Sequence, residues 1–283
     1  MNIAPWIKRT AKQLIRSKVS PWLLDKDLLP TRTVSPQALK AFMDSVCPVA
    51  TNHGLVRIGG EGDGGYLVPD DLDGVRFCFS PGVSEVADFE LSLAARGIKC
   101  FLADYSVDAP PVQHPLFVFE KKYLGPSDDA IFITLESWLS QVDPAESDLI
   151  LQMDIEGAEY GVILDASDET LSRFRIVVIE FHDLQGLTDR LGFELINLTL
   201  RKLLKQFDIV HIHPNNCRKP LVFQDFEIPP VMEFSFLRKD RITTRLPASS
   251  FPHPLDRTNM SGAEDFALPT CWFRTPGASR AAQ

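Results

Sequence analysis

The sequence predicts an α/β fold in which a doubly wound, Rossmann-like sheet carries a site at the carboxyl ends of its strands. The apolar run 149–153 changes within one residue into a cluster of carboxylates and a glycine, and an apolar helical stretch follows. Residues 75–104 have the pattern of a strand, a loop, a helix and a second strand. The apolar run 174–179 likewise ends in polar residues. Ligands bind at the carboxyl ends of strands in such sheets, so these polar residues are the functional candidates.

The composition is that of an ordinary globular protein with an acidic balance. The chain has 283 residues, of which 45% are hydrophobic and 24% charged, with a net charge of −9. We expect a helical extension over 1–50, one α/β domain over 51–240, and a tail over 241–283 that packs on the domain. The acidic balance argues against a nucleic-acid partner and tolerates a cationic ligand in a carboxylate-rimmed site.

The five cysteines are scattered and show no metal-binding or redox spacing. Cys78 and Cys100 lie in apolar, strand-like runs and are predicted to be small core residues. This usage suits a reducing compartment. No apolar run approaches the roughly 18 residues of a membrane span, and the N-terminus lacks the apolar core of a signal peptide. The sequence therefore predicts a cytoplasmic protein.

Residues 1–20 differ from the rest of the chain because they carry five basic residues and no acidic one. Their apolar residues can share one side of a helix. Basic amphipathic helices lie on anionic membrane surfaces, so weak peripheral membrane contact is one interpretation, and a loosely packed leading helix is the other. A second N-terminal helix is predicted from Ser35, an N-cap that precedes Pro36, to Pro48.

Residues 55–68 surround a glycine-rich centre, with five glycines in the seven residues 59–65. Glycines are costly to order, so a chain keeps them where the backbone must turn sharply or approach a ligand. The Asp63-Gly64 pair is a turn signal that predicts a β-hairpin. A hairpin that also covers a site would satisfy both interpretations.

Residues 75–104 predict a β-loop-α-β unit. The first strand leads into the loop 80–84, and Ser84 can cap the helix that follows. The second strand, 98–103, ends at Asp104, about 20 residues past the loop, where nucleotide-binding units hold ribose hydroxyls. The loop is not GxGxxG, which argues against a dinucleotide and leaves room for an adenosine ligand without phosphates.

Asp154 stands at the tip of the central strand and is the first functional candidate. An acid in the first turn of a helix is also explained by the helix dipole, which is the favoured explanation for Glu156. Because neighbouring strands are predicted to be parallel, Glu180 and His182 are expected at the same sheet edge as Asp154 and Asp104. A lone histidine is more often structural, but His182 beside two carboxylates is a candidate for function.

Further helices and strands are predicted on both sides of the central stretch. Thr134 is a predicted N-cap for a short helix. The other predicted elements are strands over 116–119 and 131–133, a helix over 187–207, a strand over 208–213, and strands over 221–223 and 231–237 that complete the sheet and form an antiparallel hairpin at one edge.

Together these residues resemble the FkbM-type methyltransferases, a family of S-adenosylmethionine-dependent enzymes. The central match is Met-Asp-Ile-Glu-Gly-Ala-Glu at 153–159, supported by 57–60 with 63–66, by 178–180 and by 211–216. The resemblance covers roughly residues 52–240. It implies a seven-stranded doubly wound sheet with an antiparallel last strand, and O-methylation of hydroxyls on sugars or secondary metabolites.

The resemblance also implies where S-adenosylmethionine binds. Ser80, Gly82 and Ser84 would lie under its methionine part, Asp104 would hold the ribose, and Asp154 would face the sulfonium. The predicted cofactor-binding set is completed by Asp63, Gly64, Gly65, Tyr66 and Glu90.

Methyl transfer to a hydroxyl requires alignment of the reactants and removal of a proton. His182 is the predicted base, and Asp154 either orients it or is the base itself. Alternatively, Asp154, Glu180 and His182 bind a divalent metal, Mg²⁺ or Mn²⁺, that acidifies the acceptor. The acceptor is expected to be a small molecule or glycan, recognised by His213, Asn215 and Asn216.

Two other functions remain open from the sequence. One is a nicotinamide-dependent oxidoreductase on a similar fold, which the absence of a GxGxxG loop disfavours. The other is a non-catalytic module that uses its basic N-terminus to associate with membranes or glycans.

Overall fold

The computed structural model of the 283-residue chain describes residues 22, 23, 26, 31–83, 85–143, 145 and 147–274. The expected leading helix and membrane contact of residues 1–20 lie outside the described residues, as does the predicted cofactor ligand Ser84.

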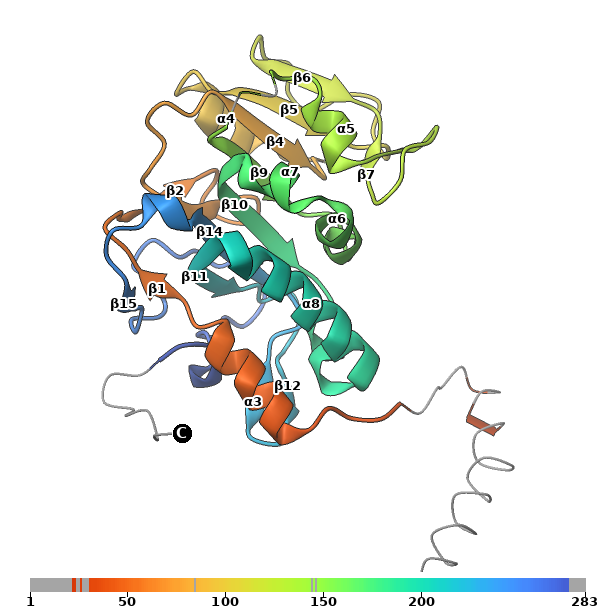
Figure 1. Cartoon of the computed structure of the whole chain (residues 1–283), viewed down its shortest axis with the longest axis vertical. Helices are drawn as coiled ribbons and strands as arrows, with labels where there is room; N and C mark the ends of the chain where they lie inside the picture. The colour runs from red at the N-terminus through yellow and green to blue at the C-terminus, as the bar shows by residue number, and fades with distance from the viewer. Residues whose placement is uncertain are drawn as a thin grey trace, which may run out of the picture.

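A seven-stranded mixed sheet forms the centre of the molecule (Figure 1). In spatial order its strands are β11 (Phe207–Pro214), β14 (Met232–Arg238), β10 (Phe174–Phe181), β9 (Leu149–Met153), β4 (Phe77–Pro81), β5 (Lys99–Ala103) and β6 (Phe117–Glu120). Strand β14 is antiparallel to both of its neighbours, and the pairs from β10 to β6 are parallel. The predicted doubly wound sheet with an antiparallel last strand is therefore confirmed.

The prediction that the strands over 221–223 and 231–237 form a hairpin at one edge of the sheet is wrong. Strand β12 (Leu221–Phe223) pairs with β13 (Phe226–Ile228) in a separate two-stranded ribbon. Strand β14 instead lies between β10 and β11, where all but its last residue are buried. A short turn between two apolar runs suggests that they pair, but β14 buries more apolar surface inside the sheet than it would beside the largely exposed β12.

Helices cover one face of the sheet, and a hairpin with one helix covers the other (Figure 1). The first face is covered by α3 (Pro36–Ser45), α5 (Leu135–Leu139), α6 (Glu159–Asp165), α7 (Asp168–Ser172) and α8 (Arg190–Gln206). The second is covered by α4 (Asp88–Ala94) and by β2 (Leu55–Ile58) with β3 (Tyr66–Pro69). Successive strand residues alternate between the two cores, as Phe79 and Cys78 do.

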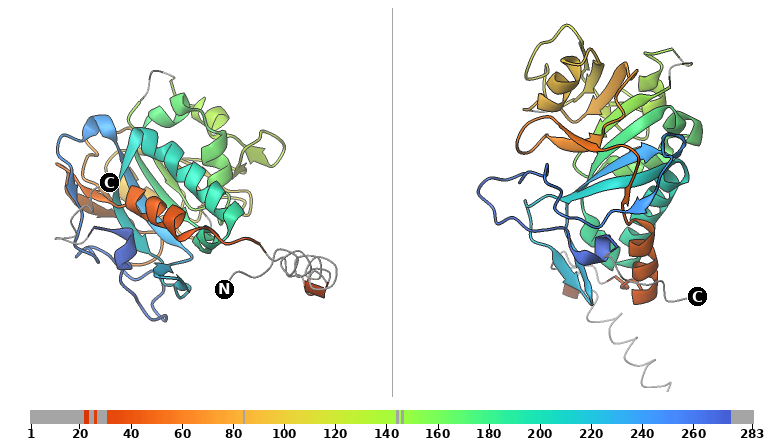
Figure 2. Two further views of the ribbon diagram at one scale, coloured as in Figure 1. Left: turned by 60° about the horizontal axis from the view of Figure 1, so that its bottom comes forward. Right: turned by 90° about the vertical axis from the view of Figure 1, so that its left-hand side faces the viewer.

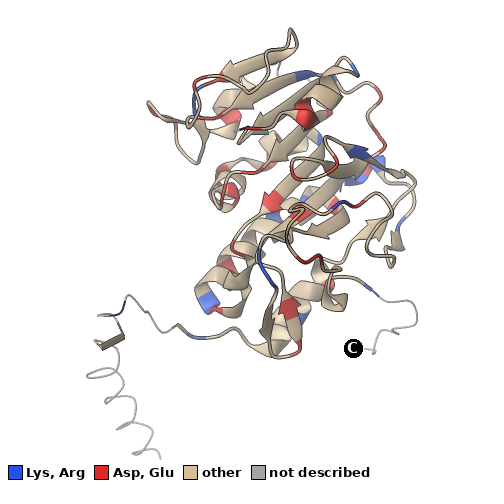
Figure 3. Ribbon diagram, turned by 180° about the vertical axis from the view of Figure 1, so that it is seen from behind, with Lys and Arg blue, Asp and Glu red and all other residues tan. Residues whose placement is uncertain are grey.

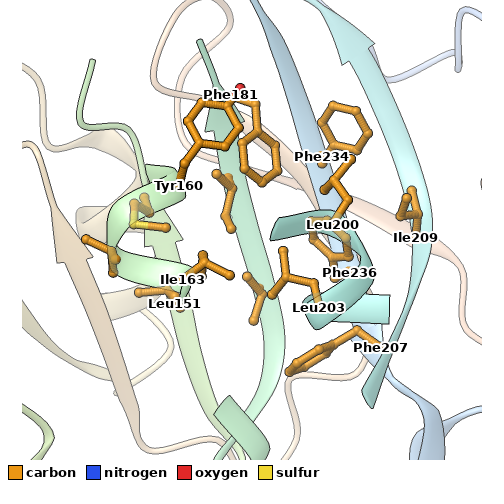
Figure 4. Packing of buried hydrophobic residues seen from close by; sticks show 14 of the residues in the cluster. Leu151, Tyr160, Ile163, Phe181, Leu200, Leu203, Phe207, Ile209, Phe234 and Phe236 are labelled. Carbon is orange, nitrogen blue, oxygen red and sulfur yellow. The ribbon is translucent and has the colours of Figure 1, made fainter. Parts of the chain in front are cut away.

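Figure 4 shows the larger core, in which α8 packs on the strands behind it. Leu200 and Leu203 of α8 lie close to Phe234 and Phe236 of β14. The Phe234 ring meets the ring of Phe181 edge-on at 5.5 Å between centroids. Phe181 is the last residue of β10, so this packing fixes where the carboxyl end of that strand lies.

The glycine-rich segment forms the predicted hairpin. Strands β2 and β3 are antiparallel, and the Arg57 guanidinium donates to the carbonyls of Gly60 (2.7 Å) and Gly62 (2.9 Å) within the loop between them. The helix after β4 begins later than expected, at Asp88 with Ala87 as its cap residue. The predicted caps Ser35 and Thr134 each accept a backbone N–H in the first turn of their helices.

The tail runs back along the domain, and Figure 2 shows it in blue beside α3 in orange. The rings of Phe42 in α3 and Trp272 are 6.3 Å apart between centroids. The remaining short elements are β1 (Val49–Ala50) paired with β15 (Leu246–Pro247), β7 (Tyr123–Leu124) paired with β8 (Phe132–Ile133), η2 (Leu184–Thr188), η3 (Lys239–Arg241) and η4 (Thr270–Trp272). The division into 1–50, 51–240 and 241–283 stays a prediction.

Cys78 and Cys100 are fully buried, as expected of core residues. Acidic and basic residues are interspersed over the described elements in Figure 3, so the net negative charge is not confined to one segment. Among the helices that the structure describes, none has both the length and the apolar character to cross a membrane.

Candidate active site

The carboxyl ends of β9 and β10 bring Asp154, Glu180 and His182 together. The two strands are parallel neighbours in which Met153 pairs with Ile179, so the residues at their ends meet. The Nε2 atom of His182 lies 3.8 Å from Oδ1 of Asp154 and 3.9 Å from Oε1 of Glu180. An imidazole nitrogen therefore faces these two carboxyl groups at the sheet edge, and the exposed Glu156 carboxylate approaches the same nitrogen at 3.5 Å.

A tight turn after Asp154 places another carboxylate beneath the imidazole. Glu156 and Gly157 both have left-handed backbone conformations, with φ of 56° and 102°. This conformation is uncommon for residues other than glycine. The turn directs the fully buried Glu159 back toward the strand end, where its Oε1 accepts the N–H groups of Ile155 and Gly157, each at 3.1 Å.

Glu159 also fixes the tautomer of His182. Its Oε1 lies 3.1 Å from Nδ1 of His182 and already accepts two backbone N–H groups, so Nδ1 carries the proton and donates it. The Nε2 atom is left with its lone pair toward Asp154 and Glu180. Burial lowers the pKa of His182, but the hydrogen bond and charge of Glu159 outweigh it, so the pKa is raised. The Tyr160 hydroxyl donates to the His182 carbonyl and holds the backbone.

Asp154 and Glu180 sit in an environment that favours their neutral forms. Burial raises the pKa of Asp154 to about 7. Burial, followed by the charges of Asp154 and Glu233, raises the pKa of Glu180 well above its ordinary value. The Asn215 amide donates to Oε1 of Glu180 at 3.0 Å. Within the described residues, Oδ1 of Asp154 and Oε2 of Glu180 are buried without a hydrogen-bond partner.

A small cavity of about 110 Å³ adjoins Asp154 between the glycine-rich hairpin and the loop after β4. Gly82, at φ of 91°, allows that loop to approach β9, because a Cβ at this position would lie 1.8 Å from the Asp154 carbonyl oxygen. The Ser80 hydroxyl contacts both the Glu90 carboxyl and the Gln152 side-chain oxygen. A hydroxyl has one proton to donate, and burial raises the pKa of Glu90, so a protonated Glu90 can donate the second hydrogen bond.

Most of the predicted cofactor-binding residues lie at this cavity. Those that line it are Asp63, Gly64, Tyr66, Gly82, Glu90 and Asp154. Gly65, Ser80 and Asp104 are not among its lining residues. Asp104 is buried beside the loop, and its Oδ1 accepts the N–H and the hydroxyl of Ser106 at 2.7 and 2.6 Å. The roles of all these residues toward a cofactor stay predictions.

The segment that contains the carboxyl ends of β9 and β10 is similar to a known family. Residues 131–208 match the Methyltransferase FkbM domain. The resemblance inferred from the sequence is confirmed over that segment, which contains Asp154, Glu159, Glu180 and His182. The FkbM match supports methyltransferase activity.

The solved structures that are similar to this chain at low identity include two methyltransferases. An S-adenosylmethionine-dependent methyltransferase from Listeria monocytogenes has 11% identity and a TM-score of 0.36, over 58% of this chain and 90% of that one. A TehB-like S-adenosylmethionine-dependent methyltransferase from Corynebacterium glutamicum has 12% identity and a TM-score of 0.32, over 83% and 100%. Among curated proteins, no sequence matches this chain.

Beyond the FkbM segment, a row of polar residues extends across the sheet from Glu180. Glu180 pairs with Glu233 on β14, and Glu233 pairs with His213 on β11. Burial raises the pKa of Glu233 to about 7, and the Asn259 amide donates to its Oε1 at 2.6 Å. Both ring nitrogens of His213 lack a hydrogen-bond partner among the described residues, and His213 lines a cavity of about 440 Å³ under the tail.

The three residues predicted to recognise the acceptor have different surroundings. His213 faces a cavity, Asn215 holds Glu180, and the Asn216 amide is engaged with the backbone of Met260 and Ala263. Their roles toward an acceptor stay predictions. The sequence interpretation missed Glu159 as the partner of His182, although Glu159 stands in the FkbM motif that it quoted.

Proposed function

We propose that this protein is an S-adenosylmethionine-dependent O-methyltransferase whose acceptor is a hydroxyl of a sugar, glycan or secondary metabolite. The supporting observation is that the FkbM segment places His182, held through Nδ1 by Glu159, next to Asp154, which lines the cavity. The cytoplasmic location inferred from cysteine usage stays a prediction.

The cavity suits one end of this cofactor. S-adenosylmethionine carries a sulfonium and an ammonium group against a single carboxylate, so it is cationic. Asp63, Glu90 and Asp154 line the cavity, and no Lys or Arg is among its described lining residues. A cationic ligand would also compensate the unpartnered oxygen of Asp154. The volume of about 110 Å³ is below the roughly 300 Å³ of a complete small-molecule site, so we place only the methionine end here.

The chain's own contribution to the reaction is the handling of a proton. S-adenosylmethionine supplies an activated methyl group on sulfur and leaves as a neutral thioether. A hydroxyl acceptor must lose its proton as its oxygen forms the new bond. Nε2 of His182 is the atom available to take it, because Glu159 holds the other ring nitrogen as a donor and stabilises the imidazolium that results. In its ionised form, Asp154 adds a negative charge 3.8 Å from Nε2.

The proposal is tested by titration calorimetry of the purified chain with S-adenosylmethionine and, separately, with NADH. We expect micromolar binding of the first and no binding of the second. Asp104→Ala, which removes the predicted partner of the ribose, should weaken that binding. Glu136→Gln, which changes an exposed acid on α5, is the matched control. Binding of NADH alone would favour the oxidoreductase hypothesis, and binding of neither would favour a non-catalytic module.

A further inference from the structure

We propose that Asp154, Glu180 and His182 form a binding site for one divalent cation of the Mn²⁺ type. Each side chain offers one ligand atom, and these atoms all lie within 4.8 Å of one another. The function of the cation rests on the proposed methyl transfer, but its binding does not.

The strongest sign of a missing partner is Glu180. This side chain is 4% exposed. Asn215 occupies its Oε1, and its Oε2 is buried without a partner among the described residues. Oδ1 of Asp154 is in the same state. A buried acceptor without a hydrogen bond costs about 1–3 kcal/mol, and more when it is charged.

No lysine or arginine in the described part of the chain forms an ion pair with Asp154 or Glu180. The basic side chain near both carboxyl groups is His182. Elsewhere in this protein, the buried carboxylate of Asp71 is paired with Arg175 and Arg241. The cluster at the sheet edge is therefore short of positive charge, which a cation would supply.

His182 is oriented as a ligand. Its Nδ1–H donates to Glu159, so the Nε2 lone pair is directed away from that carboxylate and toward the other two. A carboxylate behind a coordinating histidine is the usual outer partner of a metal ligand, because it fixes the tautomer and raises the basicity of the ring.

The spacing and the ligand types agree with this cation. Around a small divalent cation, neighbouring ligands are about 3 Å apart and opposite ligands about 4.2 Å apart. Nε2 lies 3.8 and 3.9 Å from the two carboxylate oxygens, between these two values, so small side-chain movements would complete the coordination. Two carboxylates with one imidazole combine the preferences of Mg²⁺ and of later transition metals, which points to Mn²⁺.

The cation would change the role of His182. Its lone pair would bind metal, and an acceptor hydroxyl at an open coordination position would have a lowered pKa and release its proton to water. His182 would then be a ligand rather than the base.

The test uses the full chain, freed of metal with a chelator and titrated with Mn²⁺ while free Mn²⁺ is followed by electron paramagnetic resonance. We expect one bound Mn²⁺ per chain. Glu180→Gln and Asp154→Asn should each weaken binding by more than about tenfold. Glu233→Gln is the matched control, because this buried neighbour on β14 is already bonded to Asn259. The Mn²⁺ affinity of this variant should remain within about threefold of that of the unchanged chain.

The inference is overturned if the unchanged chain binds no Mn²⁺, or if Glu233→Gln weakens binding as much as Glu180→Gln does. Thermal unfolding of each variant shows that the fold is kept, and Asp154→Asn serves if Glu180→Gln does not fold. S-adenosylmethionine is titrated into the metal-free chain in parallel. Cofactor binding without Mn²⁺ binding would end the cation inference alone, and the reverse result would end the proposed function alone.

Discussion

Strands β9 and β10 have charged residues at both ends, and the two ends differ in how those charges are paired. At the amino ends, Arg175 is buried and forms ion pairs with Asp148 (3.0 Å) and Asp71 (3.6 Å). Arg238 adds a second ion pair to Asp148 at 2.6 Å. At the carboxyl ends, neither Asp154 nor Glu180 has a lysine or arginine partner within the described residues.

The pairing has opposite effects on two aspartates that flank the same strand. The hydrogen bond from Arg175 holds the pKa of Asp148 down to about 2. Burial raises the pKa of Asp154 to about 7. A shifted pKa alone therefore does not mark a functional site in this protein. The informative sign is a shift toward the neutral form with buried oxygens left unpartnered.

The largest expected effect is a loss of methyl transfer when a side chain at the carboxyl ends of β9 and β10 is removed. His182→Ala should lower methyl transfer to an identified acceptor by about 10²–10⁴-fold, because deprotonation of the acceptor depends on this imidazole both when it is the base and when it holds the cation. Thermal stability should change little. Tyr160→Phe is the control, since it removes only the hydroxyl that contacts the His182 carbonyl, and its effect should be much smaller. Transfer of label from S-adenosylmethionine measures both, and equal losses would assign His182 a purely structural role.

The next effect concerns stability at the amino ends. Arg175→Met should lower the free energy of unfolding by about 3–5 kcal/mol, because it leaves buried Asp71 without one of its partners and removes one from Asp148. Denaturant unfolding measures the loss. A change below about 1 kcal/mol would show that this cluster contributes no more than an exposed ion pair.

The two ends should also respond to pH with opposite signs. Asp148 has a lowered pKa in the folded state, so its contribution is present above about pH 4 and is lost as the pH falls toward 2. Asp154 has a raised pKa, so in metal-free buffer the folded state loses stability as the pH rises from about 4 to about 7. The loss of stability between about pH 4 and 2 should be smaller in Asp148→Asn than in the unchanged chain, and an equal loss would contradict the assignment.

The smallest effect is expected at the surface. Lys205→Ala breaks a 2.9 Å ion pair with Asp168 in which both side chains are more than half exposed. Solvent screens such a pair, so the free energy of unfolding should change by about 1 kcal/mol or less. A larger loss in denaturant unfolding would mean that burial is not what separates this pair from the Arg175 cluster.

The sequence was most informative about which polar residues lie at the carboxyl ends of the parallel strands. Asp154, Glu180 and His182 were placed at one edge because parallel strands end at the same side, and that inference needs only the apolar runs and their order. The glycine-rich hairpin and the caps at Ser35 and Thr134 also followed from local chemistry.

Contacts between segments that are distant in the chain could not be predicted from the sequence. Glu233 joins the polar row because β14 lies between β10 and β11, and no local pattern distinguishes this from pairing with β12. Asn259 and Asp256 reach β14 and β11 from the tail, through contacts that depend on the path of an irregular segment. Glu159 was within the quoted motif, but its contact with His182 depends on the left-handed turn at Glu156 and Gly157.

The position of β14 has a consequence for synthesis on the ribosome. Strands β10 and β11 are made earlier, yet each pairs with β14, and β11 joins the sheet only through it. Until residues 232–238 have left the exit tunnel, both strands present open, apolar edges, which are the features that promote association between nascent chains. The sheet can therefore close only late in translation, and we expect nascent chains that stop before β14 to depend on chaperones.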